Sequence, residues 1–142
     1  MDQRGFMIEV IDDVIYWTNT TGDITEKDAL SISHQIRSLV ELGNIEAVIV
    51  DNRRLFGVWS PEVDKVWIDL MAYLPRYVER TATLCQNVIN KLQLNYLSAQ
   101  AGTEDHVQAF TENEEPQMAH FLKLDDVFLF PPRKDINDHI LK

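Results

Sequence analysis

The stretch VIVDNRRLFGVWSP, residues 48–61, decides the fold. It opens on three β-branched residues, and together with Ala47 they form the short apolar run that is typical of a buried central strand. It closes on Ser60 and Pro61, which suit the cap and the first position of a helix. A strand that leads directly into a helix is typical of an α/β domain.

The same alternation continues on both sides of this stretch. Asp12 and Asp13 separate two β-rich runs and suit a tight antiparallel hairpin, because short acidic residues tolerate a positive φ. Thr25 opens a capping box, and Gly43 suits the position just after a helix end. We predict strands over 6–11, 14–20, 47–50, 77–85 and 106–111, and helices over about 26–42, 61–74, 88–101 and 114–122.

These elements predict the fold class and the domain organisation. We expect a single α/β domain over residues 1–122, with a mixed β-sheet of about five strands that opens with an antiparallel hairpin. About four helices are expected to pack on this sheet. Residues 123–142 form a C-terminal tail. Val127 to Phe130 are too apolar to lie comfortably in water, so we expect the tail to dock on its own domain or on a neighbouring subunit.

Composition and charge limit the classes of function. The chain has 23 acidic and 13 basic side chains and a net charge of −10, which disfavours binding to nucleic acid or to an anionic membrane surface. No run of 18 apolar residues occurs, so no membrane span is expected. The single cysteine, Cys85, excludes an internal disulfide, and the stretch MDQRGFMIEV does not resemble a signal peptide. We therefore expect a cytoplasmic protein.

Three stretches resemble the STAS domain, the fold of anti-sigma-factor antagonists and of the cytoplasmic tails of sulfate transporters. They are TTGDITEKDAL at 20–30, AVIVDNRRLFG at 47–57 and VQAFTENEEPQMAHFL at 107–122. The likeness is greatest to small bacterial proteins that are called anti-sigma-factor-antagonist-like, and it covers roughly residues 6–122. The resemblance implies a STAS-like fold and a non-enzymatic regulatory module that binds a protein partner. The apolar tail and the apolar loop after the central strand favour a second copy of the chain as that partner, so a homodimer is expected.

The loop after the central strand is the first candidate site. Arg53, Arg54, Phe56, Val58 and Trp59 combine arginine with large apolar side chains, and aromatic and arginine side chains dominate interface energetics. Connections usually run over the surface, and in STAS proteins this loop and the second helix meet the partner. We therefore expect an interaction surface here. The alternative is that the aromatic residues fold back and cover the end of the sheet.

Two phosphorylation sites come into question. Antagonists of the STAS family are phosphorylated on a serine at the start of the second helix, and Ser60 has the equivalent place, but the Asp-Ser-Ser-Gly-like motif is absent. A simple N-cap role explains this serine as well. An aspartyl phosphate on Asp51, as in receiver domains, conflicts with the order of elements, because Asp12 and Asp13 lead into a strand. Asp51 is expected to bond the backbone at the strand end.

No catalytic residue, metal site or cofactor is predicted. His34, His106, His120 and His139 are scattered without the spacing of metal ligands. Cys85 follows an apolar strand sequence and is most simply a small buried hydrophobe. The five glycines are spread along the chain and form no phosphate-binding loop.

The large aromatic residues suggest an alternative function. STAS-like folds resemble Sec14-type lipid-binding domains, so the chain could instead carry a small apolar molecule between its helices and its sheet. Trp17, Trp67 and Tyr73, together with Trp59, are the candidates for lining such a pocket. Retention of a small molecule by the purified protein would distinguish a carrier from an interaction module.

Overall fold

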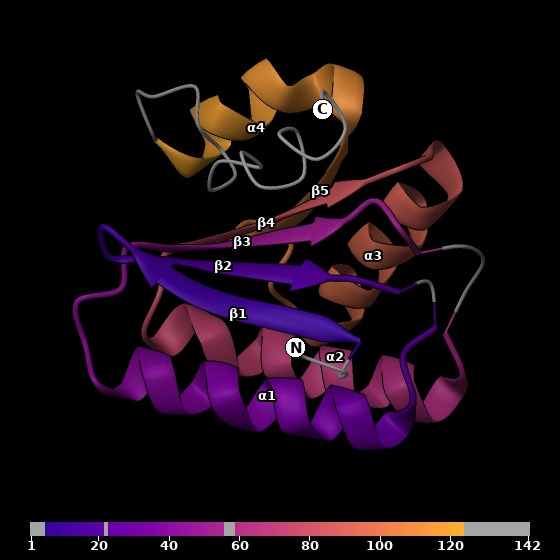
Figure 1. The fold of residues 1–142 in the computed structure, drawn as a ribbon. Coiled ribbons are helices and arrows are strands. Elements are labelled where there is room, and N and C mark those ends of the chain that lie inside the picture. The colour runs from indigo at the N-terminus through magenta and orange to yellow at the C-terminus, as the bar shows by residue number, and fades with distance from the viewer. Residues whose placement is uncertain (1–4, 22, 56–58, 124–142) are drawn as a thin grey trace, which may run out of the picture.

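The computed structural model describes residues 5–21, 23–55 and 59–123. Within these ranges, five strands form one sheet in the order β1-β2-β3-β4-β5 (Figure 1). The first pair is antiparallel, and each later pair is parallel. The predicted α/β fold class is therefore confirmed. The strands are β1 Phe6–Ile11, β2 Val14–Asn19, β3 Ala47–Asn52, β4 Arg80–Cys85 and β5 Val107–Thr111.

The hairpin between β1 and β2 turns at the two aspartates. Asp12 and Asp13 both have a positive φ, 51° and 65°, which is the backbone of a two-residue type I′ turn. This turn matches the right-handed twist of the paired strands, so Ile11 pairs directly with Val14. The predicted tight hairpin is confirmed.

Three helices cover one face of the sheet and the fourth covers the other (Figure 1). Each of α1, α2 and α3 lies between two parallel strands, and right-handed crossovers place such helices on the same face. Their first turns are capped by Thr25, Ser60 and Asn87, whose side chains accept a hydrogen bond from the backbone three residues on. The helices are α1 Glu26–Glu41, α2 Pro61–Tyr73, α3 Val88–Ala101 and α4 Glu115–Leu122.

The sheet separates two hydrophobic cores. The larger core packs Ile15 and Val48 against α1, α2 and α3. The smaller core packs Ile49 and Leu84 against Met118 of α4. All six residues of β3 are buried, as expected for the central strand of a sheet that is covered on both faces.

The fourth strand is shorter than the predicted range of 77–85. A 3₁₀ turn, η1 Leu74–Arg76, follows α2. The backbone N–H groups of Tyr77 and Val78 both donate to the Leu74 carbonyl at 2.9 Å. These residues therefore complete the helical turn, and the strand begins only at Arg80. A second 3₁₀ turn, η2 Glu112–Glu114, joins β5 to α4.

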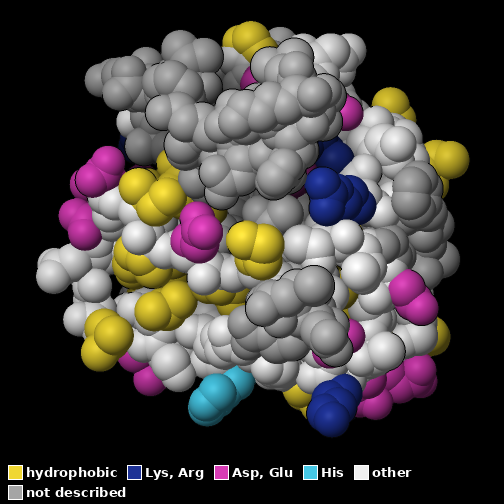
Figure 2. Space-filling view, in the orientation of Figure 1, with side chains coloured by type: hydrophobic (Ala, Val, Ile, Leu, Met, Phe, Trp, Pro, Cys, Tyr) yellow, Lys and Arg dark blue, Asp and Glu magenta, His cyan; other side chains and the backbone are white. Residues whose placement is uncertain are grey.

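The face of the sheet beside α4 exposes part of its apolar surface. Hydrophobic side chains gather in the region where Figure 1 draws β1 and β2 (Figure 2). Met7 and Ile11 are among the exposed apolar side chains of β1. The tail that was expected to dock on the domain lies, from residue 124 on, outside the described residues. No helix within the described ranges is long and apolar enough to span a membrane.

Candidate functional site

The carboxyl ends of the parallel strands meet at one edge of the sheet, and the candidate residues gather there. Asn19 ends β2, and Asp51 and Asn52 end β3. Thr111 ends β5 and caps η2. Ligands of open α/β sheets commonly bind at this edge.

Arg53 forms a structural ion pair at this edge. Its guanidinium donates to both carboxylate oxygens of Asp51, with Nε–Oδ1 at 3.0 Å and Nη2–Oδ2 at 2.9 Å. Its Nη1 also lies 3.4 Å from Glu112 Oε2. A planar guanidinium suits this two-point contact. The side chain therefore ties the end of β3 to η2, whereas Arg54 beside it is exposed.

Trp59 is buried, so the expectation of a surface tryptophan is wrong. Only 8% of the residue is exposed, and its ring packs edge-on against Trp67 of α2 at a centroid distance of 5.7 Å. Burial of the large indole against the core outweighs the tendency of connections to stay at the surface. The fold-back alternative holds for Trp59. Phe56 and Val58, predicted to share that surface, lie outside the described residues.

Ser60 has the geometry of an N-cap. Its Oγ accepts a hydrogen bond from Val63 N at 3.2 Å, and Pro61 occupies the first helical position behind it. The residue is exposed. The cap accounts for its position at the start of α2, and its phosphorylation stays a prediction.

The three tryptophans of the chain surround one cavity. Trp17 of β2 lies 5.1 Å from Trp67, centroid to centroid, and Trp59 also contacts Trp67. The expectation that Tyr73 lines the same cavity is wrong, because its ring is stacked against Tyr77 and the Arg37 guanidinium. The cavity is completed by residues of the sheet, α2, η1 and α3: Asn19, Val50, Asn52, Leu70, Met71, Leu74, Thr81, Thr83, Leu94 and Val107.

Three buried N–H donors belong to residues that line this cavity. They are Asn52 Nδ2, Trp59 Nε1 and Trp67 Nε1, and within the described part of the chain none has a hydrogen-bond partner. The volume of the cavity that water molecules can enter is about 30 Å³, which is room for about two water molecules. The unfilled space is about 410 Å³ when the part that opens to solvent is included.

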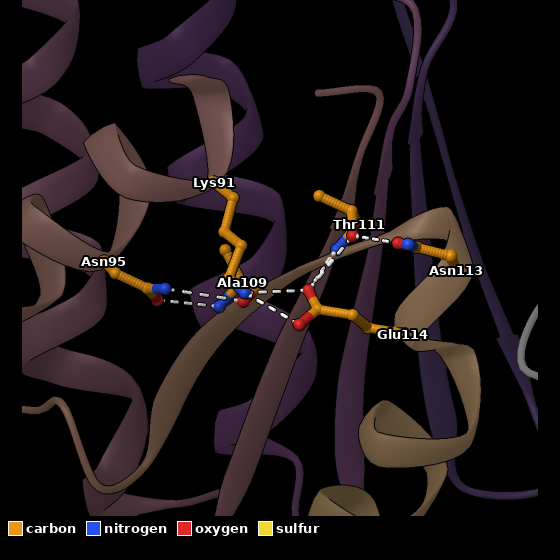
Figure 3. A network of polar contacts seen from close by, with 6 residues as sticks. All are labelled: Lys91, Asn95, Ala109, Thr111, Asn113 and Glu114. Carbon is orange, nitrogen blue, oxygen red and sulfur yellow. Dashed lines mark hydrogen bonds and ion pairs between the residues drawn. The ribbon is translucent and has the colours of Figure 1, made fainter. Parts of the chain in front are cut away.

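A polar network joins α3 to the start of α4 (Figure 3). Lys91 Nζ lies 2.8 Å from both carboxylate oxygens of Glu114, and Thr111 N donates to the same carboxylate at 2.9 Å. The Lys91 ammonium, followed by the Thr111 backbone, lowers the pKa of Glu114 to about 2. The Asn95 side chain donates to the Ala109 carbonyl oxygen and accepts from the Ala109 N–H group. These two backbone groups of the edge strand β5 are therefore not free to pair with another strand.

The solvent side of α3 is a feature that we did not predict. Val88, Ile89, Leu92 and Tyr96 are 59–71% exposed, and their spacing places them along one side of the helix. We call these four residues the α3 face. Lys91 carries the helix's only charge and is paired with Glu114. The sequence pattern that indicated this face was the presence of apolar residues on more than one side of the predicted helix.

The thiol and the histidines form no reactive cluster in the part of the chain that the structure describes. Cys85 is fully buried, and burial raises the pKa of its thiol to about 12. No group of three His, Cys, Asp or Glu side chains within the described ranges could hold a metal ion. His106 Nδ1 lies 3.0 Å from the Glu79 carbonyl oxygen, and His139 lies outside the described residues.

No protein-family model, curated protein or solved structure matches this chain.

Proposed function

We propose that this chain is a non-enzymatic regulatory module that acts through protein–protein contact, and that its α3 face binds a second copy of the chain. The observation that carries the proposal is the α3 face itself. Four large apolar side chains with exposures of 59–71% lie on one side of a helix, and contiguous apolar surface of this kind is typical of an interaction site.

Charge favours a second copy as the occupant of this surface. Each copy carries a net charge of −10, so most contacts between two copies bring like charges together. The α3 face has no charged side chain, and the one cation on the helix is neutralised by Glu114. A two-fold contact across α3 therefore buries apolar groups on both copies without opposing their acidic side chains.

Burial of apolar surface supplies the driving force for such a contact. Full burial of a leucine-sized side chain contributes about 1.5–3 kcal/mol. A two-fold contact buries the four side chains of each copy, and this gain must exceed an association cost of about 4–15 kcal/mol. The resemblance of residues 6–122 to STAS proteins, which act by binding protein partners, supports the same kind of function.

Sedimentation velocity of matched variants tests this proposal. Leu92→Glu places a charge in the centre of the α3 face and should weaken self-association by about tenfold or more, because a buried unpaired carboxylate is costly. Leu30→Glu on α1 is the control, since Leu30 is a similarly exposed helical leucine at 54%. Equal association of the two variants, or of Leu92→Glu and the wild type, would contradict the proposal.

A further inference from the structure

The tryptophan-lined cavity is a second site, separate from the α3 face, and its hydrogen bonds have a fixed direction. Trp17 Nε1 donates to Asn19 Oδ1 at 2.8 Å, and Asn19 Nδ2 donates to Asn52 Oδ1 at 2.7 Å. An indole nitrogen can only donate. Trp17 therefore fixes the orientation of the Asn19 amide, and Asn19 in turn fixes that of Asn52. The chain of hydrogen bonds must end in a donor, Asn52 Nδ2.

Two more unpaired donors belong to residues that line this cavity. Asn52, Trp59 and Trp67 are only 1%, 8% and 3% exposed, and their N–H groups have no partner in the described residues. Buried N–H groups are almost always hydrogen-bonded in folded proteins. The acceptor oxygens of Asn19 and Asn52 are already used within the chain. Three donors of the lining residues are therefore unpaired, and an occupant that accepts hydrogen bonds would satisfy them.

The lining also limits the charge and shape of the occupant. None of the described residues that line the cavity carries a charge, so a buried anion would have no counter-charge, and its desolvation would be costly. Most of the remaining wall is apolar and is formed by indole rings and by side chains such as Val50 and Leu70, although Thr81 and Thr83 also line the cavity. An uncharged acceptor on a small apolar body satisfies both features.

We propose that this cavity binds a small uncharged molecule through a carbonyl-type oxygen that accepts hydrogen bonds from Asn52, Trp59 and Trp67. The cavity has room for about two water molecules, so only the acceptor end and a few carbon atoms fit as it stands. A larger ligand would extend toward the part that opens to solvent. The ligand class is thus a ketone, amide or ester with a compact apolar end.

Three probes of the same shape test each part of this proposal. Acetone, acetate and isobutene are planar molecules of four heavy atoms that present, in turn, a neutral acceptor, a charged acceptor and no acceptor. The indole N–H signals in a ¹H–¹⁵N spectrum of the full chain report directly on the donors. Acetone should shift the Trp59 and Trp67 signals saturably and the Trp17 signal less, because Trp17 already donates to Asn19.

The other two probes give the outcomes that would overturn the proposal. Acetate binding as tightly as acetone would overturn the uncharged class, and isobutene binding as tightly would show an apolar cavity in which the donors play no part. No saturable shift with acetone would overturn the site itself.

A pair of isosteric variants provides a second test. Asn52→Asp keeps the oxygen that accepts from Asn19, and its ionised carboxylate has no donor. At a pH where the variant's carboxyl group is ionised, acetone should therefore bind about tenfold more weakly. Asn113→Asp makes the same change at an exposed residue outside the cavity and keeps the oxygen that accepts from Thr111, so acetone binding should be retained. Unchanged binding by folded Asn52→Asp would contradict the proposal. The backbone amide spectrum reports whether each variant is folded. If Asn52→Asp is unfolded, the three probes with the wild-type protein still test the proposal.

Discussion

At the scale of single residues, Trp59 connects the loop after β3 to the core. Its ring packs on Trp67 and closes one side of the cavity. Trp59→Ala should lower the free energy of unfolding by about 3–5 kcal/mol, the usual cost of removing a large buried aromatic ring. Urea unfolding followed by far-ultraviolet circular dichroism measures this change. Arg54→Ala, at an exposed neighbouring position, is the control and should change stability by less than about 0.5 kcal/mol. Equal effects of the two substitutions would place Trp59 on the surface after all.

The burial of Trp59 illustrates where sequence reasoning stops. Ser60 and Pro61 predicted the start of α2 correctly, because capping is local chemistry. Whether the indole just before the cap points outward or inward depends on the gap between α2 and the sheet. The indole packs on Trp67, which in turn packs on Trp17 of β2, and Trp17 is distant from Trp59 in sequence. Arg53 was predicted to lie on the interaction surface because its partner is also far away in the sequence. Glu112, 59 residues away, forms an ion pair with it.

Cys85 should be unreactive in the folded protein. Its thiol is fully buried, and burial raises its pKa to about 12, so the reactive thiolate is scarce at neutral pH. A thiol reagent such as 5,5′-dithiobis(2-nitrobenzoate) at pH 8 should therefore leave the native protein unmodified and modify it stoichiometrically in denaturant. Rapid modification of the folded protein would show an accessible, activated thiol and would reopen a nucleophilic role.

At the scale of elements, the Lys91–Glu114 pair fastens α3 to the η2–α4 segment. The folded-state pKa of Glu114 is about 2, below its ordinary value of 4.5. The pair's contribution is therefore fully present above about pH 4.5 and is lost as the pH falls toward 2. Lys91→Met should lower the urea midpoint at pH 7, and the difference from wild type should shrink at pH 4 and again at pH 3.

A matched variant distinguishes the loss of this ion pair from the loss of one positive charge anywhere on the protein. Lys65 is an exposed lysine on α2, and Lys65→Met removes the same charge. Its difference from wild type should be small at pH 7, as expected for an exposed charge. A pH-independent difference for Lys91→Met, or an equal pH dependence in both variants, would contradict the assigned role of Glu114.

The α3 helix shows why an interaction surface can escape a search for periodicity. Leu94 and Leu97 fill the core, while Ile89 and Leu92 face solvent. An apolar stripe identifies the buried side of a helix only when the opposite side is polar. In α2 that contrast is clear, because its buried residues share one side of the helix: Val63, Val66, Trp67, Leu70 and Met71. In α3 it is weak, so three-dimensional placement was needed to show which apolar residues are exposed.

At the scale of the whole molecule, the order of elements was sufficient for the fold. A hairpin followed by alternating helices and strands leaves few arrangements once crossovers are right-handed. The hairpin, the buried β3 and the capped helices were predicted because each rests on local chemistry or on hydrophobic pattern. The cavity was only partly anticipated. Its Asn19–Asn52 hydrogen bond joins strands 33 residues apart in sequence, and no short-range pattern reveals such a contact.

The central claim is that the chain associates with itself through an uncharged apolar face, and native mass spectrometry tests it most directly. Spectra of the wild-type protein over a range of concentrations should show dimer that increases with concentration, beside a monomer near 16.5 kDa. The Leu92→Glu variant should remain monomeric over the same range. A wild-type protein that stays monomeric at every concentration, or a dimer that survives Leu92→Glu unchanged, would contradict the account.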